Sequence, residues 1–350
     1  MNSALLLGLL LLLNATQTTI ENSINEAQET IVIEEEITEI EDTNEITISF
    51  VGDCTLGTYK GQSGNTLFTN FYEDNDATYF FENIKEVFEK DDLTFINLEG
   101  PLTSVPQTAV KEFPIKGEPE YVDILKEGSI EVCNLANNHT FDCGQKGFEE
   151  TITILKENDI GYCGEGYIYR TIENNIQIAF LGYKGFNVNN ELKETIKHDI
   201  ELERENGTQL ICVMFHYGIE RDNYSSSIQE DISRYAIDCG ADIVMGGHPH
   251  VIQGIEIYKG KTICYSLGNF CFGANKNPKD KDTFIFSQTF ILNEKGEIEY
   301  KESEIIPCSI SSQTNINDYK PTILVGEEKE RVLERLKTYS EKYETSYFDK

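Results

Sequence analysis

Basic residues are scarce in this sequence. The 350 residues include 29 Lys and Arg against 61 Asp and Glu, which gives a formal net charge of −32 at pH 7, and no basic residue precedes Lys60. Nucleic-acid binding requires a basic surface, so this balance argues against a nucleic-acid partner. It also argues against binding to an anionic membrane surface. An anionic substrate would have to be held by bound cations or by a local cluster of basic side chains.

Cysteine pairs of the Cys-x-x-Cys type are absent. The chain has nine cysteines, an odd number. Most lie in apolar runs, as Cys212 does within residues 209–215, where a free thiol behaves as a small buried hydrophobic group. The sequence therefore predicts free thiols rather than a disulfide framework, although it leaves room for one or two bridges.

No apolar run is long enough to cross a bilayer as a helix. The longest covers residues 4–13, about half of the roughly 20 residues that a spanning helix needs. It predicts a signal peptide or a short membrane anchor over residues 1–20, although the positively charged start typical of signal peptides is missing. Residues 21–45 then carry ten acidic residues and no basic one, which predicts a disordered acidic linker.

The rest of the chain has the size of one large domain with an α/β pattern. We expect this domain over residues 46–310, followed by a C-terminal extension over 311–350 that includes a helix at 327–343. Expected strands are 46–51, 93–98, 130–135, 176–181, 210–215 and 242–245, and expected helices are 79–89, 118–126, 145–157 and 226–239. After residue 250 the pattern changes to hairpins over 251–258, 261–267, 283–292 and 297–306. The change favours two packed sheets with helices outside.

Histidine is also scarce, and its placement is informative. Four of the five histidines follow strand-like runs: His139, His216, His248 and His250. Proline between the last two stiffens their loop and lowers the cost of holding both imidazoles toward one site. Neutral imidazole is the commonest metal ligand in proteins, although the pair taken alone fits an ordinary loop equally well. His198 lies in a polar segment, residues 191–205, and is expected to be a surface residue.

Polar residues of other types recur at the ends of the same strands. Asp53, Glu99 and Asn138 each follow an expected strand. Taken singly, each fits a turn, a helix cap or a solvated charge. Ligands bind outside the carboxyl ends of strands in open α/β sheets, so together with the histidines these residues predict one mixed nitrogen and oxygen site suited to Zn, Mn or Fe rather than Ca. The number of ligands favours two ions about 3.5–4 Å apart, bridged by a carboxylate.

Six short motifs follow one another in a specific order. They are Gly52-Asp53, Asn97-Leu98-Glu99, Leu135-Ala136-Asn137-Asn138-His139, His216-Tyr217-Gly218, Gly247-His248-Pro249-His250 and Tyr265-Ser266-Leu267-Gly268-Asn269-Phe270. From about Thr47 to Phe272 the chain resembles the CapA family of poly-γ-glutamate capsule biosynthesis proteins, which is related to the calcineurin-like metallophosphoesterases. The resemblance implies an α/β fold, the four-layer α/β/β/α sandwich of the metallophosphoesterase type. It also implies an extracytoplasmic protein, secreted or anchored at the cell envelope.

The resemblance further implies roles for individual residues. The implied ligands are Asp53 and His250 for the first metal, Glu99 as the bridge, and Asn138, His216 and His248 for the second. His139 corresponds to the histidine that acts as a general acid or stabilises the transition state. Phosphoesterases have a histidine two residues after the first aspartate, whereas this sequence has Thr55. The first metal site is therefore expected to be weak or empty.

Other residues of the motifs have open or shared roles. Asp142, three residues after His139, either orients that imidazole or caps the helix expected from Gln145. Substrate contacts are expected from Asn137, Glu220, Ser266 and Asn269. Residues 265–270 also fit a sharp strand exit around Gly268. A basic cluster at the rim would support substrate handling, and its candidates are Lys111, Lys116, Lys184 and Arg221.

Two functions of different classes follow from these observations. The first is a metal-dependent hydrolase or transferase that acts on phosphoester or γ-glutamyl amide bonds, within capsule metabolism or unrelated to it. The second is a non-catalytic component of a membrane complex that makes or exports poly-γ-glutamate or another envelope polymer. The set of ligand-type residues favours the first as chemistry, and the family resemblance favours the second as a biological role. The sequence leaves both the question of activity and the identity of the metal open.

Overall fold

The computed structural model describes residues 44–349. The signal peptide or anchor expected over residues 1–20 lies outside the described residues, as does the acidic linker expected over 21–45 apart from its last two residues. Within the described part of the chain, no helix combines the length and the apolar character needed to cross a bilayer.

The larger sheet has eight strands. Its order is β16 (Thr322–Ile323), β15 (Ile298–Ser309), β14 (Asp282–Leu292), β1 (Glu45–Thr55), β3 (Leu93–Leu98), β5 (Val132–Asn134) and β6 (Gly161–Cys163), and β13 (Asn269–Phe272) also pairs with β1. β1, β3, β5 and β6 run parallel, while β14 and β15 are antiparallel. The α/β part and the hairpin part expected from the sequence therefore share one sheet.

The second sheet has six strands. Its order is β11 (Ile255–Tyr258), β12 (Lys261–Cys264), β10 (Ile243–Gly247), β9 (Leu210–His216), β8 (Ile176–Lys184) and β7 (Tyr169–Glu173). β8, β9, β10 and β12 are parallel. A small sheet joins β2 (Thr58–Tyr59) to β4 (Ile115–Lys116). All six strands expected before residue 250 are confirmed, with shifts of a few residues at their ends.

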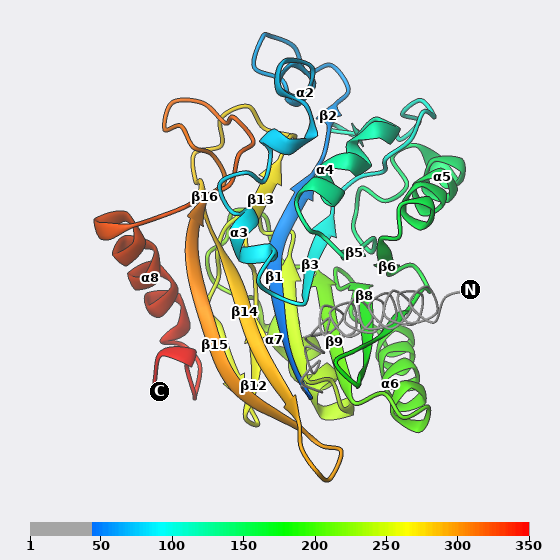
Figure 1. Ribbon diagram of the computed structural model, residues 1–350, viewed down its shortest axis with the longest axis vertical. Helices are drawn as coiled ribbons and strands as arrows, with labels where there is room; N and C mark the ends of the chain where they lie inside the picture. The colour runs from blue at the N-terminus through cyan, green and yellow to red at the C-terminus, as the bar shows by residue number, and fades with distance from the viewer. Residues whose placement is uncertain (1–43, 350) are drawn as a thin grey trace, which may run out of the picture. The chain divides into compact units, whose positions relative to one another are not determined.

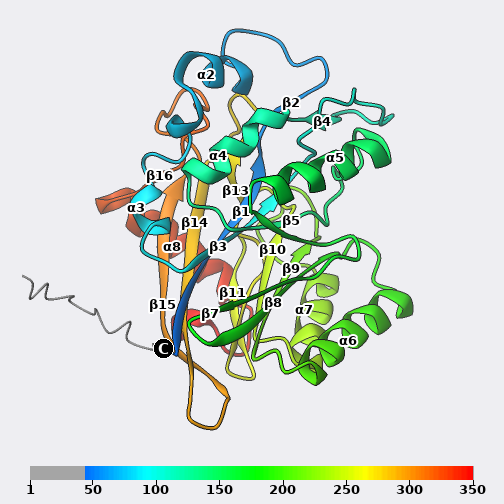
Figure 2. The ribbon, with the colours of Figure 1, turned by 45° about the vertical axis from the view of Figure 1, so that its right-hand side comes forward.

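Helices flank both large sheets, as Figures 1 and 2 show. Those before residue 160 are α2 (Phe68–Asn75), η1 (Ala77–Tyr79), α3 (Lys85–Phe88), η2 (Pro119–Tyr121), α4 (Val122–Glu127) and α5 (Gly144–Glu157). Those after it are α6 (Asn190–Glu205), α7 (Ser227–Cys239), α8 (Gly326–Ser340) and η3 (Tyr347–Asp349). α7 begins with a capping box between Ser226 and Gln229, which satisfies free backbone N–H groups at its start.

Three apolar clusters define the layers. One lies between the two sheets and includes Phe50, Phe95 and Phe180. A second joins the larger sheet to helices α2 to α5, and a third joins the second sheet to α6 and α7. The order helix, sheet, sheet, helix confirms the four-layer α/β/β/α sandwich. Burial of the aromatic and aliphatic side chains in these clusters is the main source of stability.

The structure differs from the sequence prediction in several elements. The polar segment 191–205 forms α6, which buries only Ile196, Ile200 and Glu203, too narrow an apolar stripe to stand out in the sequence. The helix expected over 79–89 is split between η1 and α3. The helix expected over 327–343, within the extension 311–350, is confirmed as α8, and its Val332 and Leu336 belong to the cluster between the sheets. This helix lies beside β15 (Figure 1).

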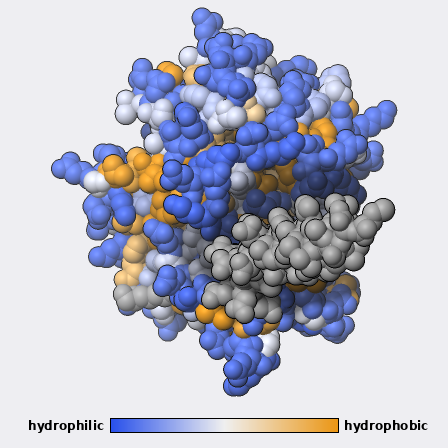
Figure 3. All heavy atoms as spheres, in the orientation of Figure 1, coloured by the Kyte–Doolittle hydropathy of each residue, from blue (hydrophilic) through white to orange (hydrophobic). Residues whose placement is uncertain are grey.

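Two further expectations from composition are met by the structure. All nine cysteines are free, and eight of them are buried, which confirms the prediction of free thiols. The molecular face in Figure 3 is mostly hydrophilic, with apolar residues in small groups. His198 is exposed on α6, as expected for a surface residue.

Candidate metal centre

The carboxyl ends of the parallel strands of both sheets bring the expected ligands together. Asp53 lies near the end of β1, and Glu99 directly follows β3. The loop after β5 carries Asn138, while β9 ends at His216. His248 and His250 follow β10, whose Gly247 pairs with His216 in register. Side chains separated by up to about 200 residues in the sequence therefore meet at one rim because parallel strands place their ends at the same edge.

Close backbone packing at this rim requires glycine and unusual backbone angles. A Cβ on Gly247 would lie 2.4 Å from Asp53 Oδ1, so only glycine leaves room for that carboxylate. His248 and His250 have φ angles of 92° and 58°, in the left-handed region that non-glycine residues rarely adopt. Such strain is concentrated at functional sites, where the surrounding structure enforces it.

Asp53 is held rigidly at the base of the centre. It is fully buried; Asn97 Nδ2 donates to its Oδ1 at 2.8 Å, and the backbone N–H of His248 donates to its Oδ2 at 3.0 Å. His250 Nδ1 lies 3.2 Å from Oδ2. Burial alone would raise the pKa of Asp53, but the hydrogen bond to His250 and the charges of the nearby histidines lower it to about 2. Asp53 is therefore an anion at neutral pH.

Glu99 is held in a very different way. Its side chain is fully buried, and neither carboxylate oxygen has a hydrogen-bond partner among residues 44–349. His139 Nε2 and His216 Nε2 lie 3.6 and 3.8 Å from Oε1. Burial and the charge of Asp53 raise the pKa of Glu99 to about 8. A buried carboxylate without hydrogen bonds is costly, and a coordinated cation is the partner that fits this arrangement.

Two groups of side chains have the spacing of a metal site. In each, the ligand atoms lie within 4.8 Å of one another: one group is Asp53, Glu99 and His250, and the other is Glu220, His248 and His250. Asn138 Oδ1 lies 2.8 Å from His216 Nε2, beside the first group. Carboxylate, amide and imidazole donors together suit a divalent transition metal. Glu220, expected to contact substrate, thus lies among the ligand-type residues.

The imidazoles differ in protonation. Burial holds the pKa of His216 well below its usual value and lowers that of His248 to about 4, so both are neutral at pH 7. Neutral imidazole is the form that binds metals, and His248 Nδ1 has no partner among the described residues. Burial also disfavours the charged form of His250, but the carboxylates of Glu99 and Asp53 outweigh it and raise the pKa to about 9. In the metal-free protein at pH 7, His216 and His248 are therefore in the form that binds a divalent cation, whereas His250 would have to release its proton to bind one.

His139 is held by a carboxylate and an ammonium group. Its Nδ1 lies 2.7 Å from Asp142 Oδ2 and 2.9 Å from Lys111 Nζ, and Lys111 also pairs with Asp142 Oδ1 at 2.6 Å. Nδ1 donates to the carboxylate in one tautomer and accepts from the ammonium in the other. The alternative role of Asp142 as a helix cap is wrong, because α5 has Cys143 at its N-cap and no side-chain cap.

Three residues expected to contact substrate are engaged with the protein instead. Asn137 donates to the Leu98 carbonyl at 2.8 Å and accepts from the backbone N–H of His139. The Ser266 hydroxyl donates to the Val251 carbonyl at 2.7 Å, and Asn269 Oδ1 lies 2.9 Å from His250 Nδ1. All three are at most 3% exposed. These contacts give them positioning roles in the loops of the centre.

Sequence reasoning assigned no role to Asn97 or Phe186. Asn97 Nδ2 lies 3.1 Å from His216 Nδ1 and joins that imidazole to Asp53. Its signal is a polar residue inside the buried strand β3. The Phe186 ring lies 4.6 Å from that of His248. Of the expected basic cluster, the Lys111 side chain contacts Asn138, His139 and Asp142, whereas the Lys116 side chain pairs with Glu118 and that of Lys184 with Glu165.

The sequence is similar to known bacterial proteins. Residues 47–274 match the family described as "Bacterial capsule synthesis protein PGA_cap". The chain is 31% identical over 249 residues to the PGA biosynthesis protein CapA of Bacillus subtilis (strain 168), covering 65% of this chain and 63% of that protein. It is 31% identical over 257 residues to the capsule biosynthesis protein CapA of Bacillus anthracis, covering 66% of this chain and 61% of that protein. It thus spans less than two thirds of the length of each relative.

Among solved structures, the chain is similar to a hypothetical protein from Thermus thermophilus. The TM-score is 0.47 at 12% sequence identity, and the alignment covers 75% of this chain and 99% of that one. A TM-score in this range does not establish a common fold. The layer order described above therefore rests on the sheets and clusters of this chain itself.

Proposed function

The chain belongs to the bacterial capsule synthesis protein family PGA_cap, and on this premise we propose that it acts in the synthesis or export of poly-γ-glutamate or a similar envelope polymer. Its CapA relatives carry names that refer to PGA and capsule biosynthesis. We further propose that it works outside the cytoplasm, through a metal-dependent hydrolase-type site directed at γ-glutamyl amide or phosphoester bonds.

The main support for a metal-dependent hydrolase site is the environment of Glu99. This carboxylate is fully buried, lacks hydrogen-bond partners in the described part of the chain, and is faced by imidazoles. Without a bound cation this group keeps its proton at neutral pH, as its pKa of about 8 indicates, because an anion in such a place would lose several kcal/mol of solvation without compensation. A role as a metal ligand accounts for both its burial and its free oxygens.

The residues divide into ligands and proton-handling groups. Asp53, Glu99 and His250 would hold one cation, and Glu99, Asn138, His216 and His248 a second, with Glu220 available to either set at the exposed side. When bound, such ions polarise a substrate oxygen and lower the pKa of bound water toward about 7.

His139 is placed to protonate a leaving group or to hold developing charge through Nε2. Asp142 and Lys111 fix its other nitrogen. Asn97 and Asn269 keep the rings of His216 and His250 in place. Burial lowers the pKa of His139, so the ring is neutral at neutral pH and has a proton on Nε2 only in the tautomer whose Nδ1 accepts from Lys111. In that tautomer the chain's own residues would supply the orientation and the proton that general acid catalysis requires.

A second candidate function rests on Thr55. This residue stands where the phosphoesterases have a histidine, and its buried hydroxyl has no hydrogen-bond partner among residues 44–349. A hydroxyl is a weaker ligand than imidazole for a transition metal, so the Asp53 side of the centre is the weaker one. With only one ion bound, a non-catalytic role in polymer assembly becomes the better account.

Elemental analysis combined with two activity assays tests these proposals. The full chain, His248→Ala and the matched control His198→Ala would be purified, loaded with Mn or Zn, and assayed on a phosphodiester and on a γ-glutamyl amide. Two ions per wild-type chain, with turnover that is lost in His248→Ala and retained in the control, would support the hydrolase. Wild-type protein that stays metal-free and inert would overturn it and favour the assembly role.

A further inference from the structure

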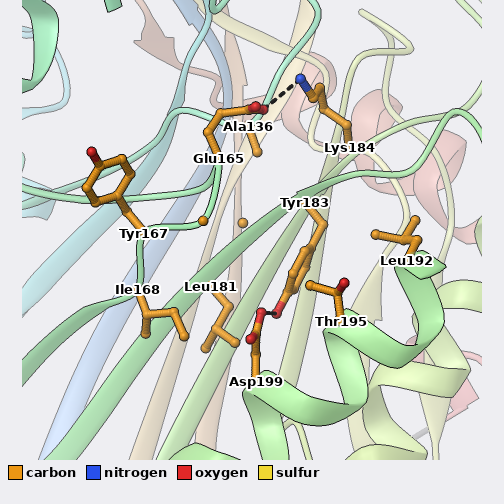
Figure 4. Close-up of a pocket in the computed structure, with 12 residues that line it drawn as sticks. Ala136, Glu165, Tyr167, Ile168, Leu181, Tyr183, Lys184, Leu192, Thr195 and Asp199 are labelled. Atoms are coloured by element: carbon orange, nitrogen blue, oxygen red, sulfur yellow. Dashed lines mark hydrogen bonds and ion pairs between the residues drawn. The ribbon is translucent and has the colours of Figure 1, made fainter. Parts of the chain in front are cut away.

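A cavity of about 200 Å³ lies between the loop after β6, strand β8 and helix α6. Its walls include the apolar side chains of Ile168, Leu181 and Leu192. In Figure 4, Glu165 and Lys184 meet at one end of this cavity, and Tyr183 and Asp199 meet at the other. The volume is that of a ligand of amino-acid size rather than of a large cofactor.

The cavity adjoins the candidate metal centre. Lys184 is the last residue of β8 and pairs in register with His216 at the end of β9, so their Cα atoms are about 5 Å apart. Ala136, in the opposite wall, lies two residues before Asn138 on the same loop. The end of the cavity at Lys184 therefore lies beside the centre.

An ion pair with both charges accessible lies at the end nearest the centre. Glu165 Oε1 and Lys184 Nζ are 2.7 Å apart, with side chains 16% and 36% exposed. The Lys184 ammonium also lies 5.4 Å from the centre of the Phe141 ring. A ligand with an ammonium and a carboxylate on one carbon can replace this ion pair with two. Its ammonium would pair with Glu165 and its carboxylate with Lys184.

The far end of the cavity is polar. The Tyr183 hydroxyl donates to Asp199 Oδ2 at 2.9 Å, which occupies one of the two carboxylate oxygens. Between the two ends, the apolar walls match methylene groups. The arrangement of a paired charge, then an apolar wall, suits an α-amino-acid head group followed by a short aliphatic arm.

We propose that this cavity is a binding subsite for an unblocked α-amino-acid group, namely the amino-terminal residue of a γ-linked glutamyl chain. In such a chain every residue keeps its α-carboxylate, but only the first also keeps a free α-ammonium group. Glu165 recognises the ammonium and Lys184 the carboxylate, so the subsite selects the chain end. The choice of a glutamyl ligand rests on the proposed function, whereas the recognition of a free head group rests on the cavity itself.

Binding of defined dipeptides tests the subsite. Isothermal titration of the full chain would use γ-glutamyl-glutamate, its N-acetyl derivative, and α-glutamyl-glutamate, whose first residue lacks a free α-carboxylate. The expected result is binding of the first peptide only, weakened about tenfold or more in Glu165→Gln and in Lys184→Met, as the loss of one charged contact predicts. Lys197→Met is the matched control, because Lys197 forms an exposed pair with Glu201 on α6, 3.9 Å long.

The outcomes separate the subsite from the hydrolase proposal. Equal binding of the N-acetyl derivative, unchanged affinity in both variants, or no binding of γ-glutamyl-glutamate by the wild type would overturn the subsite. Metal content measured on the same samples reports on the centre independently, and thermal melting checks that the variants are folded. Selective binding by a chain that holds no metal and hydrolyses nothing would support the subsite and refute the hydrolase.

Discussion

Two glutamates at opposite ends of the larger sheet, one fully buried and one half-buried, have similar acidities and different surroundings. Glu99 follows the carboxyl end of β3, and Glu131 precedes the amino end of β5. Burial is the main cause of the raised pKa in both, to about 8 and about 7 respectively. Glu131 Oε2 accepts a hydrogen bond of 2.7 Å from the backbone N–H of Thr94, whereas neither oxygen of Glu99 has a partner among the described residues.

The comparison shows that a raised pKa alone does not mark a functional site. Both values report burial, and a structural network produces the shift as readily as a ligand site does. The distinguishing features of Glu99 are its unpartnered oxygens and the imidazoles within 4 Å. At the amino end of the sheet, the neighbours are backbone groups and Asp91, whose Oδ2 accepts from Thr94, and no histidine takes part.

The largest expected effect comes from replacing each glutamate, Glu99 at the carboxyl end of the sheet and Glu131 at its amino end, by glutamine. Glu99→Gln is expected to lower metal affinity by more than the ~10–100-fold typical of losing an outer-shell contact, because it removes a ligand that faces both groups of donors. Glu131→Gln is expected to leave metal affinity unchanged. Titration of both proteins with Zn or Mn measures this, and equal losses in the two variants would contradict the assignment of the centre.

A smaller effect is expected from crowding the carboxylate of Asp53. A Cβ at position 247 would lie 2.4 Å from Asp53 Oδ1, so Gly247→Ala forces that side chain to move. We expect metal affinity to fall by about 10–100-fold, comparable to disturbing the support of a ligand. The same titration, with a melting curve to confirm folding, measures the effect. Wild-type affinity in a folded variant would show that Asp53 is not a ligand.

Glu131 at the amino end of the sheet is expected to contribute to pH-dependent stability. Burial raises the pKa of Glu131 from 4.5 to about 7, so the folded state holds this proton more tightly than the unfolded state. The resulting stability is complete below about pH 4.5 and is lost as pH rises through about 7, a change on the order of 1–3 kcal/mol in the free energy of unfolding.

Glu131→Gln tests this assignment, because its amide oxygen can still accept from Thr94. Denaturant unfolding at several pH values is expected to show a smaller decline in stability for the variant between about pH 5 and 8. A residual slope is expected from Asp91 and Glu99, whose pKa values burial raises to about 6 and about 8. A decline as steep as that of the wild type would contradict the assignment.

The smallest effect is expected at the fifth histidine. His198 is exposed on α6 and belongs to neither end of the larger sheet. His198→Ala is expected to change the free energy of unfolding by no more than about 0.5 kcal/mol and to leave metal affinity unchanged. Denaturant unfolding and metal titration check both expectations, and a marked loss of metal would mean that binding occurs at surface histidines rather than at the rim.

Much of the fold was predictable because it follows from local patterns in the sequence. Short apolar runs predicted the central strands, and the residues that follow them predicted a common rim, since parallel strands place their carboxyl ends together. The hairpins after residue 250 were also predicted. The missed elements, α6 and β7, depend on long-range contacts: Glu203 of α6 is fully buried against Arg170 of β7, with Nε to Oε2 at 2.9 Å.

The candidate centre was predictable in its residue types but not in its details. Lys111 lies on an exposed loop 28 residues before His139, and no periodic pattern connects them. Nothing in the sequence distinguishes Asn97 from other polar residues of a strand. In the structure, its amide lies between Asp53 and His216. Ser266 matched a motif, but its hydroxyl is turned toward the Val251 carbonyl.

The sequence by itself determined the central strands, the excess of acidic residues, and the succession of carboxylate, amide and imidazole groups at strand ends. These follow from local periodicity and residue chemistry. Only the tertiary structure decided which oxygens of Glu99 lack partners, which nitrogen of His139 faces Asp142, and where the cavity beside Lys184 lies. Those features depend on the packing of segments distant in the chain, whose distances and burial no local pattern encodes.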